Sequence, residues 1–242
     1  MKITKGIILF GILFCGIYLF IKFGRSIYMP VIAKFNDKET VESISEKIEE
    51  SVFERIKPNL NRIGLIDFPK EIVLLALKEE RILQVYTKVN DSLVHLKSYP
   101  FKGFSGKLGP KLKEGDKQIP EGVYSIEYLN PNSSYYLSMK VSYPNEFDVS
   151  KSRFENKNEL GNDIFIHGKS ATIGCIPLGD EGIEELFILA ENAFQKNIKL
   201  IIAPRDFRVN NVFPRIIEID WENELYEIIK REIFTLPNSD LI

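Results

Sequence analysis

The spacing of hydrophobic residues changes along the chain and divides it into three kinds of segment. Residues 6–21 form an unbroken apolar run. Between residue 36 and about residue 57, apolar side chains recur at spacings of three and four, which predicts an amphipathic helix. These positions are Val41, Ile44, Ile48, Val52 and Ile56. From residue 71 onward, short runs rich in β-branched residues are typical of strands.

The β-branched runs predict a mainly β domain of the α+β class. Turn-forming pairs such as Asn90-Asp91 and Pro144-Asn145 separate the runs. Two stretches with helical spacing interrupt them, at residues 180–197, where Asp180 is the expected N-cap, and at residues 221–234. The expected strands are 72–77, 82–88, 93–99, 122–129, 135–142, 164–167 and 199–203.

These changes of pattern predict four parts. Residues 1–28 are expected to be an N-terminal signal anchor or transmembrane helix. Residues 29–69 are expected to be a helical spacer whose helix ends in the stretch 58–69, with an interaction module as the alternative. Residues 70–205 form the main domain, and residues 206–242 form a C-terminal helical extension.

The apolar run at residues 6–21 contains no charge and has basic residues on both sides, namely Lys2, Lys5, Lys22 and Arg25. Its length falls between the apolar core of a signal peptide, roughly 7 to 15 residues, and a membrane span of roughly 17 to 25. Lys22 can extend its charged end to the interface, so we expect an uncleaved anchor that contacts the membrane through residues 6–23. Cleavage near residues 24–26 and burial as a core helix are the alternatives.

Composition narrows the chemistry that the chain can perform. Hydrophobic residues make up 44% of the 242 positions, which excludes wholesale disorder, and a net charge of -2 gives no basic surface for nucleic acid. Two cysteines and two histidines exclude a disulfide framework and a four-cysteine zinc site. We therefore expect no nucleic-acid partner, no metal and no cofactor. A zinc site from His95, His167 and Cys175 is the alternative, although no close ligand pair supports it, and His95 is interpreted as structural.

One pair of residues is placed for nucleophilic chemistry. His167 ends the expected strand 164–167, and Cys175 lies just before the following helix. An imidazole that accepts the thiol proton makes a thiolate–imidazolium pair, which is a strong nucleophile. Gly174 has no Cβ, so a substrate carbonyl can approach the backbone N–H groups of Gly174 and Cys175 as an oxyanion hole. A buried small cysteine and a hydrogen-bonded structural histidine are the alternatives.

The residues around this pair form a motif. His167-Gly168 followed by Thr172-Ile173-Gly174-Cys175 resembles the signature of the L,D-transpeptidase catalytic domain family (YkuD-like), and in particular its YafK-like branch. A second block is similar to motifs of the same branch, and the resemblance covers about residues 71–205. That block consists of Gly109-Pro110-Lys111, Glu114-Gly115-Asp116 and Pro120-Glu121-Gly122.

The resemblance implies a mixed-strand β-sandwich or barrel with a helix after the catalytic cysteine. It assigns Cys175 as the nucleophile and His167 as the general base and acid, and it gives the backbone carbonyl of Gly168 the task of orienting the imidazole. The chain departs from the larger family at Ile173, where that family carries a second histidine. This departure puts in doubt any contact that the second imidazole makes.

Two further residues, Thr172 and Lys111, are candidates for substrate contact. The Lys111 ammonium would neutralise a carboxylate of an anionic peptide stem. The glycine- and proline-rich segment 109–122 is equally consistent with a plain connecting loop. Glu114 and Asp116 can form a carboxylate pair, but nothing around them predicts raised pKa values, so we expect no acid–base chemistry from them.

The resemblance implies cysteine-dependent acyl transfer on peptidoglycan peptide stems, at the L-centre of the third-position diamino acid, through a thioester. Transfer to an amine makes an L,D-transpeptidase. Transfer to water makes an L,D-carboxypeptidase or releases a lipoprotein linked to diaminopimelate. An inactive, membrane-anchored wall-binding protein is a further alternative. The implied location is the bacterial cell envelope, with an inner-membrane anchor and the catalytic domain in the periplasm.

Overall fold

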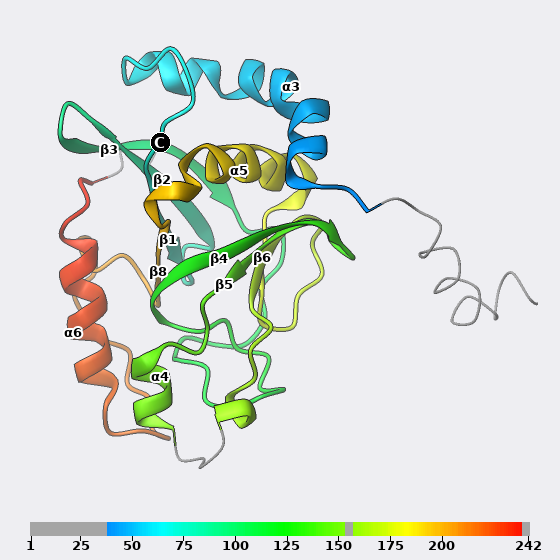
Figure 1. The fold of residues 1–242 in the computed structure, drawn as a ribbon. Helices are drawn as coiled ribbons and strands as arrows, with labels where there is room; N and C mark the ends of the chain where they lie inside the picture. The colour runs from blue at the N-terminus through cyan, green and yellow to red at the C-terminus, as the bar shows by residue number, and fades with distance from the viewer. Residues whose placement is uncertain (1–37, 153–156, 239–242) are drawn as a thin grey trace, which may run out of the picture. The chain divides into compact units, whose positions relative to one another are not determined.

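The computed structural model describes residues 38–152 and 157–238. Their centre is one eight-stranded sheet (Figure 1). The strands are β1 (Ile72–Leu77), β2 (Ile82–Val89), β3 (Ser92–Pro100), β4 (Gly122–Ser133), β5 (Tyr136–Val141), β6 (Phe165–His167), β7 (Ile176–Pro177) and β8 (Lys199–Ala203). Their order across the sheet is β3-β2-β1-β8-β4-β5-β6-β7. The β1–β8 and β6–β7 pairs are parallel and the other neighbouring pairs are antiparallel, so the sheet is mixed.

Helices cover both faces of this sheet (Figure 1). They are α3 (Val41–Arg62), α4 (Glu146–Lys151), α5 (Gly179–Ala193) and α6 (Glu222–Ile233), with short 3-10 helices at Lys157–Leu160 and Phe194–Lys196. Helices α3 and α5 pack on one face, and α6 packs on the other. The helix that follows Cys175 in the sequence is α5, as the resemblance implies.

Side-chain alternation along β1 and β8 gives the sheet two apolar faces. The core under α3 and α5 takes every second residue, namely Leu74, Ala76, Leu200 and Ile202. The core under α6 takes the residues between them, namely Leu75, Leu77, Ile201 and Ala203. Successive strand residues point to opposite faces, so a strand that is buried on both faces is apolar throughout. This explains why the 72–77 run showed no polar alternation.

Strand β4 joins the two halves of the sheet. Its residues 122–125 pair with β8, and its residues from Ile126 onward pair with β5. The register shifts between Ile126 and Tyr128, which marks a bulge on β4. A bulge bends its strand and increases the local twist, so β5, β6 and β7 turn away from the first half. The result is a mixed half-barrel built from one continuous sheet, rather than a sandwich of two sheets.

The amphipathic helix predicted near the N-terminus is present as α3, but it is not a spacer. Val52 and Ile56 are fully buried in the core under α3 and α5. The Arg55 guanidinium donates to Glu184 of α5 at 2.6 Å and to Glu185 at 3.3 Å. Burial of the apolar stripe makes α3 a structural part of the domain, because exposing it again would cost hydrophobic free energy.

Helix α3 also continues past the predicted end near residue 57, with Pro58 inside it. Proline lacks the N–H that an interior helix position donates, which is why an end was expected there. Contacts after the proline hold the last turn in place. Leu60 is buried, and the side chains of Asn59 and Arg62 donate to the carbonyl of Leu96 at 3.3 and 2.8 Å.

The C-terminal segment is part of the same core. Helix α6 lies one residue inside the predicted 221–234 at each end. Its buried residues include Leu225, Tyr226, Ile229 and Ile233. The Tyr226 hydroxyl donates to Glu121, which precedes β4, at 2.9 Å. The segment therefore completes one face of the sheet instead of extending away from it.

The other sequence predictions have mixed outcomes. All seven expected strands are present, while β7 and α4 were missed because each is too short to show a period. The N-cap of α5 is Leu178 rather than Asp180, whose carboxylate accepts instead from the Lys169 N–H at 2.9 Å. The predicted membrane segment at residues 6–23 lies outside the described residues. Within residues 38–152 and 157–238, no helix is long and apolar enough to span a bilayer.

Candidate active site

His167 lies at the end of β6 and is almost completely buried, with 2% of its surface exposed. Its Nδ1 lies 2.6 Å from the carbonyl oxygen of Gly168. A carbonyl only accepts hydrogen bonds, so Nδ1 carries the proton and Nε2 keeps a free lone pair. Burial lowers the pKa of His167, and the bond to Gly168 opposes this only in part. The imidazole is therefore a neutral base with a fixed tautomer.

Cys175 lies immediately before β7, the strand that pairs with β6. The parallel register pairs Ile166 with Ile176 and His167 with Pro177. Alternate residues share a face, so Cys175 lies on the same face as His167, two positions away along the neighbouring strand. The structure thus brings the two predicted residues together through pairing of β6 with β7, which the sequence did not reveal.

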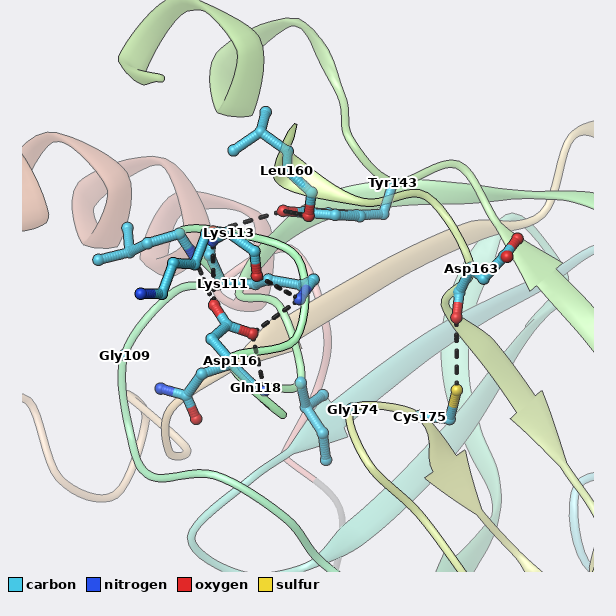
Figure 2. A network of polar contacts seen from close by, with 12 residues as sticks. Gly109, Lys111, Lys113, Asp116, Gln118, Tyr143, Leu160, Asp163, Gly174 and Cys175 are labelled. Atoms are coloured by element: carbon cyan, nitrogen blue, oxygen red, sulfur yellow. Dashed lines mark hydrogen bonds and ion pairs between the residues drawn. The ribbon is translucent and has the colours of Figure 1, made fainter. Parts of the chain in front are cut away.

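The thiol is protonated in this arrangement. The Cys175 Sγ donates to the backbone carbonyl of Asp163 at 3.6 Å (Figure 2). Burial raises the pKa of Cys175, although a hydrogen bond from the Phe165 backbone lowers it in part. With the His167 pKa lowered as well, the resting pair is a neutral thiol and a neutral imidazole. The expected thiolate–imidazolium pair is therefore not the resting state, because burial disfavours both charges.

The turn that carries the nucleophile is held by Thr172. Its hydroxyl accepts from the backbone N–H of Cys175 at 2.9 Å and from that of Gly174 at 3.3 Å, and it donates to the Cys175 carbonyl at 2.7 Å. The two N–H groups expected to form an oxyanion hole are thus occupied at rest. Thr172 was expected to contact substrate, but its hydroxyl is used within the turn.

Close backbone approach explains both glycines of the motif. Gly174 has φ of 133°, and a Cβ there would lie 3.1 Å from the carbonyl oxygen of Gln118. A Cβ on Gly168 would lie 2.7 Å from the Tyr135 carbonyl oxygen. At Gly174 the reason for glycine is thus a left-handed backbone and a neighbouring loop, in addition to any space that it leaves for substrate.

Ile173, the departure from the larger family, is an exposed apolar side chain beside the nucleophile. It is 74% exposed, while Gly174 and Ile176 on either side of Cys175 are buried. The position that holds a histidine in the larger family therefore presents hydrocarbon to solvent in this chain.

Lys111 does not present a free cation to substrate. Its ammonium is 2.7 Å from Asp116 and donates to the Lys113 carbonyl at 2.7 Å (Figure 2). Burial raises the pKa of Asp116, but Lys111 and the backbone N–H groups of residues 118, 113 and 112 outweigh it, so the pKa lies below its ordinary value. The expected Glu114–Asp116 pair is replaced by this ion pair, which folds the 109–122 loop onto itself.

The two histidines are far apart in the sheet. His95 is on β3, at the opposite end of the strand order from β6 and β7, and its Nε2 lies 2.8 Å from the Ser98 hydroxyl. Among the described residues no group of three or more His, Cys, Asp or Glu side chains is arranged to hold a metal ion.

Two residues near the pair were missed by the sequence analysis. The ring of Tyr135 lies against the His167 imidazole, with centroids 4.6 Å apart and the ring planes tilted by 37°. Lys140 of β5 is buried, and its charge lowers the pKa of Cys175. Tyr135 lies in the turn before β5 and Lys140 lies on β5, so both reach the site through the tertiary fold and no local signal in the sequence marks them.

A cavity of about 650 Å³ lies beside the site, between the 106–118 loop, α4 and residues 216–221. Neither Cys175 nor His167 lines it. Gln118 lies both on the cavity wall and against Gly174. The cavity is mainly apolar, with side chains that include Leu108, Leu112, Leu160, Ile216 and Trp221.

A half-buried thiol just before β7 and an oriented imidazole at the end of β6 define a cysteine–histidine site in a mixed half-barrel. Residues 70–198 match the L,D-transpeptidase catalytic domain family (YkuD). The match covers more than half of the chain, which therefore belongs to this family.

Among curated proteins, "Putative L,D-transpeptidase YafK" of Escherichia coli (strain K12) is 34% identical over 138 residues. The alignment covers 55% of this chain and 54% of that protein, so it spans about half of each.

Several solved structures have a related but distant fold. The helical cell shape determining protein Pgp2 from Campylobacter jejuni matches with a TM-score of 0.46 and 16% identity, over 76% of this chain and 78% of its own. Bd1075 of Bdellovibrio bacteriovorus matches with a TM-score of 0.41 and 21% identity, over 57% and 49%. L,D-transpeptidase 1 of Mycobacterium tuberculosis matches with a TM-score of 0.30 and 13% identity, over 55% and 62%. These similarities are too low to carry any residue's role to this chain.

Proposed function

We propose that this protein catalyses cysteine-dependent acyl transfer on peptidoglycan peptide stems, as an L,D-transpeptidase that acts at the L-centre of the third-position diamino acid. The observation that carries the proposal is the orientation of His167. Its Nδ1 is held by the Gly168 carbonyl at 2.6 Å, which leaves Nε2 as the proton acceptor on the face that also carries Cys175. Family membership supports the same assignment.

The first step makes the acyl-enzyme. The Cys175 sulfur attacks the carbonyl carbon of the diamino acid while the thiol proton moves to Nε2 of His167. Because both groups are neutral at rest, proton transfer accompanies the attack rather than preceding it. The carbonyl electron pair moves to oxygen, and the backbone N–H of Cys175 is available to this oxyanion once Thr172 releases it.

The second step transfers the acyl group. The His167 imidazolium protonates the departing amine, and a thioester remains on Cys175. Attack by an acceptor amine on the thioester forms a crosslink and regenerates the thiol. Neutral His167 takes the acceptor proton, so the same imidazole serves both steps.

The test is incubation of the full chain, purified in detergent, with muropeptides, followed by mass spectrometry. Crosslinked dimers from the wild type and none from the Cys175→Ala variant are expected. Cys175→Ser is a closer control, because it keeps the shape but replaces the thiol with a weaker nucleophile. Equal product from the Ala variant would remove Cys175 from the mechanism.

The same products distinguish the other fates of the thioester. Accumulation of tripeptides means that water is the acceptor and that the enzyme is an L,D-carboxypeptidase. A stem with a lipoprotein linked to diaminopimelate tests release of that partner. Binding to wall fragments without any product would identify an inactive wall-binding protein.

We also propose that the protein is anchored in the inner membrane through residues 6–23, with the catalytic domain in the periplasm of the bacterial envelope. The apolar run and its basic flanks support this location. Protease added to spheroplasts should digest the domain without permeabilisation. Protection until the membrane is broken would place the domain on the other side.

A further inference from the structure

Lys140 is a buried cation that has no ion-pair partner among the described carboxylates. It is 8% exposed, and its ammonium donates to the backbone carbonyls of Asn162 and, at 3.3 Å, Val141. Three lysines in the described part of the chain are buried, and the other two, Lys78 and Lys111, each have a carboxylate within 2.8 Å. No described carboxylate forms an ion pair with Lys140.

Strand register places Lys140 in the same row as the nucleophile. Lys140 of β5 pairs with Phe165 of β6, and its ammonium lies 5.4 Å from the centre of the Phe165 ring. Ile166 of β6 pairs with Ile176 of β7. The residues that precede these two, Phe165 and Cys175, therefore lie beside each other. The Cα atoms of Lys140 and Cys175 are two strand spacings apart, or about 10 Å. The long lysine side chain allows its ammonium to lie closer to the sulfur than the two Cα atoms are to each other.

All three residues in this row point to the same face. The residue adjacent in sequence to each of them is fully buried in the core on the opposite face; these residues are Met139, Ile166 and Ile176. The lysine charge, the Phe165 ring and the thiol therefore share the face that also carries His167.

Three charged side chains act on Cys175, and they come from three segments: the residues before β6, β5 and the 109–122 loop. After burial and the Phe165 hydrogen bond, Asp163 raises the pKa of the thiol, whereas Lys140 and Lys111 lower it. The Lys111 charge is compensated by Asp116 at 2.7 Å. His167, on β6, is neutral at rest, so of the two described lysines that act on the sulfur, Lys140 is the one without a described carboxylate partner.

We propose that Lys140 is the counter-ion of the negative charge that forms on Cys175 during the reaction. Burial of a cation whose described partners are two carbonyls and an aromatic ring is unfavourable, and the penalty is relieved when an anion appears nearby. As the Sγ–H bond breaks and the proton moves to Nε2 of His167, the developing thiolate supplies that anion. Lys140 acts through Cys175 and does not contact substrate.

This inference rests on Cys175 as the nucleophile, but it does not depend on the identity of the substrate. The probe is iodoacetamide, which alkylates the thiolate form of cysteine. The rate is measured from pH 6 to 10 on the full chain, by mass spectrometry of the peptide that contains Cys175. This readout excludes Cys15, the other cysteine.

Lys140→Met is expected to alkylate roughly three- to tenfold more slowly at neutral pH, with the midpoint of the profile moved to higher pH. Lys140→Arg keeps the charge and is expected to stay within about twofold of wild type. Lys199→Met is the matched control, because Lys199 lies on β8 and pairs with Glu232 at 2.7 Å. It is expected to leave the profile unchanged.

A wild-type alkylation profile for Lys140→Met would overturn the proposal, and so would an equal slowing in Lys140→Arg and Lys140→Met. Circular dichroism checks that the variants fold, and Lys140→Gln replaces the Met variant if that one does not. Failure of the proposed function has a different signature. No muropeptide product from wild type, together with a slowed Lys140→Met thiol, would reject the substrate and retain the counter-ion.

Discussion

Lys78 and Lys140 are both buried, but they differ in what surrounds their charge. The Lys78 ammonium lies 2.8 Å from Glu121 and donates to the carbonyls of Gly109 and Ile119 at 2.7 and 2.8 Å. The Lys140 ammonium has carbonyl partners and no described carboxylate. The Lys78–Glu121 ion pair with its two carbonyls, called here the closed network, stabilises the fold. The Lys140 ammonium, called here the open charge, is not neutralised by a described carboxylate and remains available to the neighbouring thiol.

The closed network also explains the second sequence motif. Glu121, from the Pro120-Glu121-Gly122 segment, accepts from the Gly109 N–H at 2.7 Å and from the Tyr226 hydroxyl at 2.9 Å. It thereby joins the end of β1, the 109–122 loop and α6. This part of the family-like motif is structural, and the loop that it anchors carries Gln118 to the edge of the nucleophile turn.

The largest expected effect on stability comes from breaking the buried Lys78–Glu121 ion pair. Lys78→Met leaves the Glu121 carboxylate buried without its cation, and it should lower the free energy of unfolding by about 3 to 5 kcal/mol. Urea denaturation measures this. The double variant Lys78→Met with Glu121→Gln removes both charges and should recover part of the loss. A loss below about 1 kcal/mol would show that the pair is not what holds the loop.

The next effect concerns Asp148, a buried carboxylate on the cavity wall. Burial raises its pKa to about 6 from 3.8, although bonds from Asn145 and Tyr124 lower it in part. Folding therefore favours the protonated form, and its contribution to stability is complete below about pH 4 and is lost as pH rises through about 6.

The Asp148 contribution should amount to at most about 3 kcal/mol between these pH values. Asp148→Asn keeps a hydrogen-bond acceptor but cannot ionise, so its unfolding free energy should vary less between pH 4 and 7. Urea denaturation at both pH values makes the comparison with wild type. Parallel pH dependence in the two proteins would contradict the assignment.

A smaller effect, on turnover, is expected at the turn from Thr172 to Cys175. Thr172→Val removes the hydroxyl that holds the N–H groups of Gly174 and Cys175, and it should reduce muropeptide turnover by about tenfold, or about 1.4 kcal/mol. Thr172→Ser keeps the hydroxyl and should remain near wild type. Faster turnover in the Val variant would mean that the hydroxyl's competition with the oxyanion for these N–H groups outweighs its support of the turn.

The smallest effect is expected at Tyr135, whose ring covers His167. Tyr135→Ala exposes the imidazole to water and relieves the burial that lowers the pKa of His167. The base then stays protonated to higher pH, so the acidic limb of the pH–rate profile should move up, with a loss of about 0.5 to 1.5 kcal/mol. Tyr135→Phe keeps the ring and should retain the wild-type limb. An unmoved limb in the Ala variant would exclude this role.

Local pattern was sufficient for most of the framework. The seven predicted strands, α5 and α6 could be recognised from runs of β-branched residues or from helical spacing of apolar residues. The motif around His167 and Cys175 was also visible, since the two residues flank one short loop. The role given to α3 was wrong because amphipathic spacing shows that one face is buried but not what buries it.

The sequence by itself determined the strands, the apolar faces and the choice of Cys175 with His167, because these depend on neighbours along the chain. The tertiary structure decided which buried lysines have a carboxylate partner. Lys111 is neutralised by Asp116, Lys78 by Glu121, and Lys140 by no described carboxylate. The physical reason is that the state of a buried ionisable group depends on which distant segment supplies its partner and how completely both are removed from water.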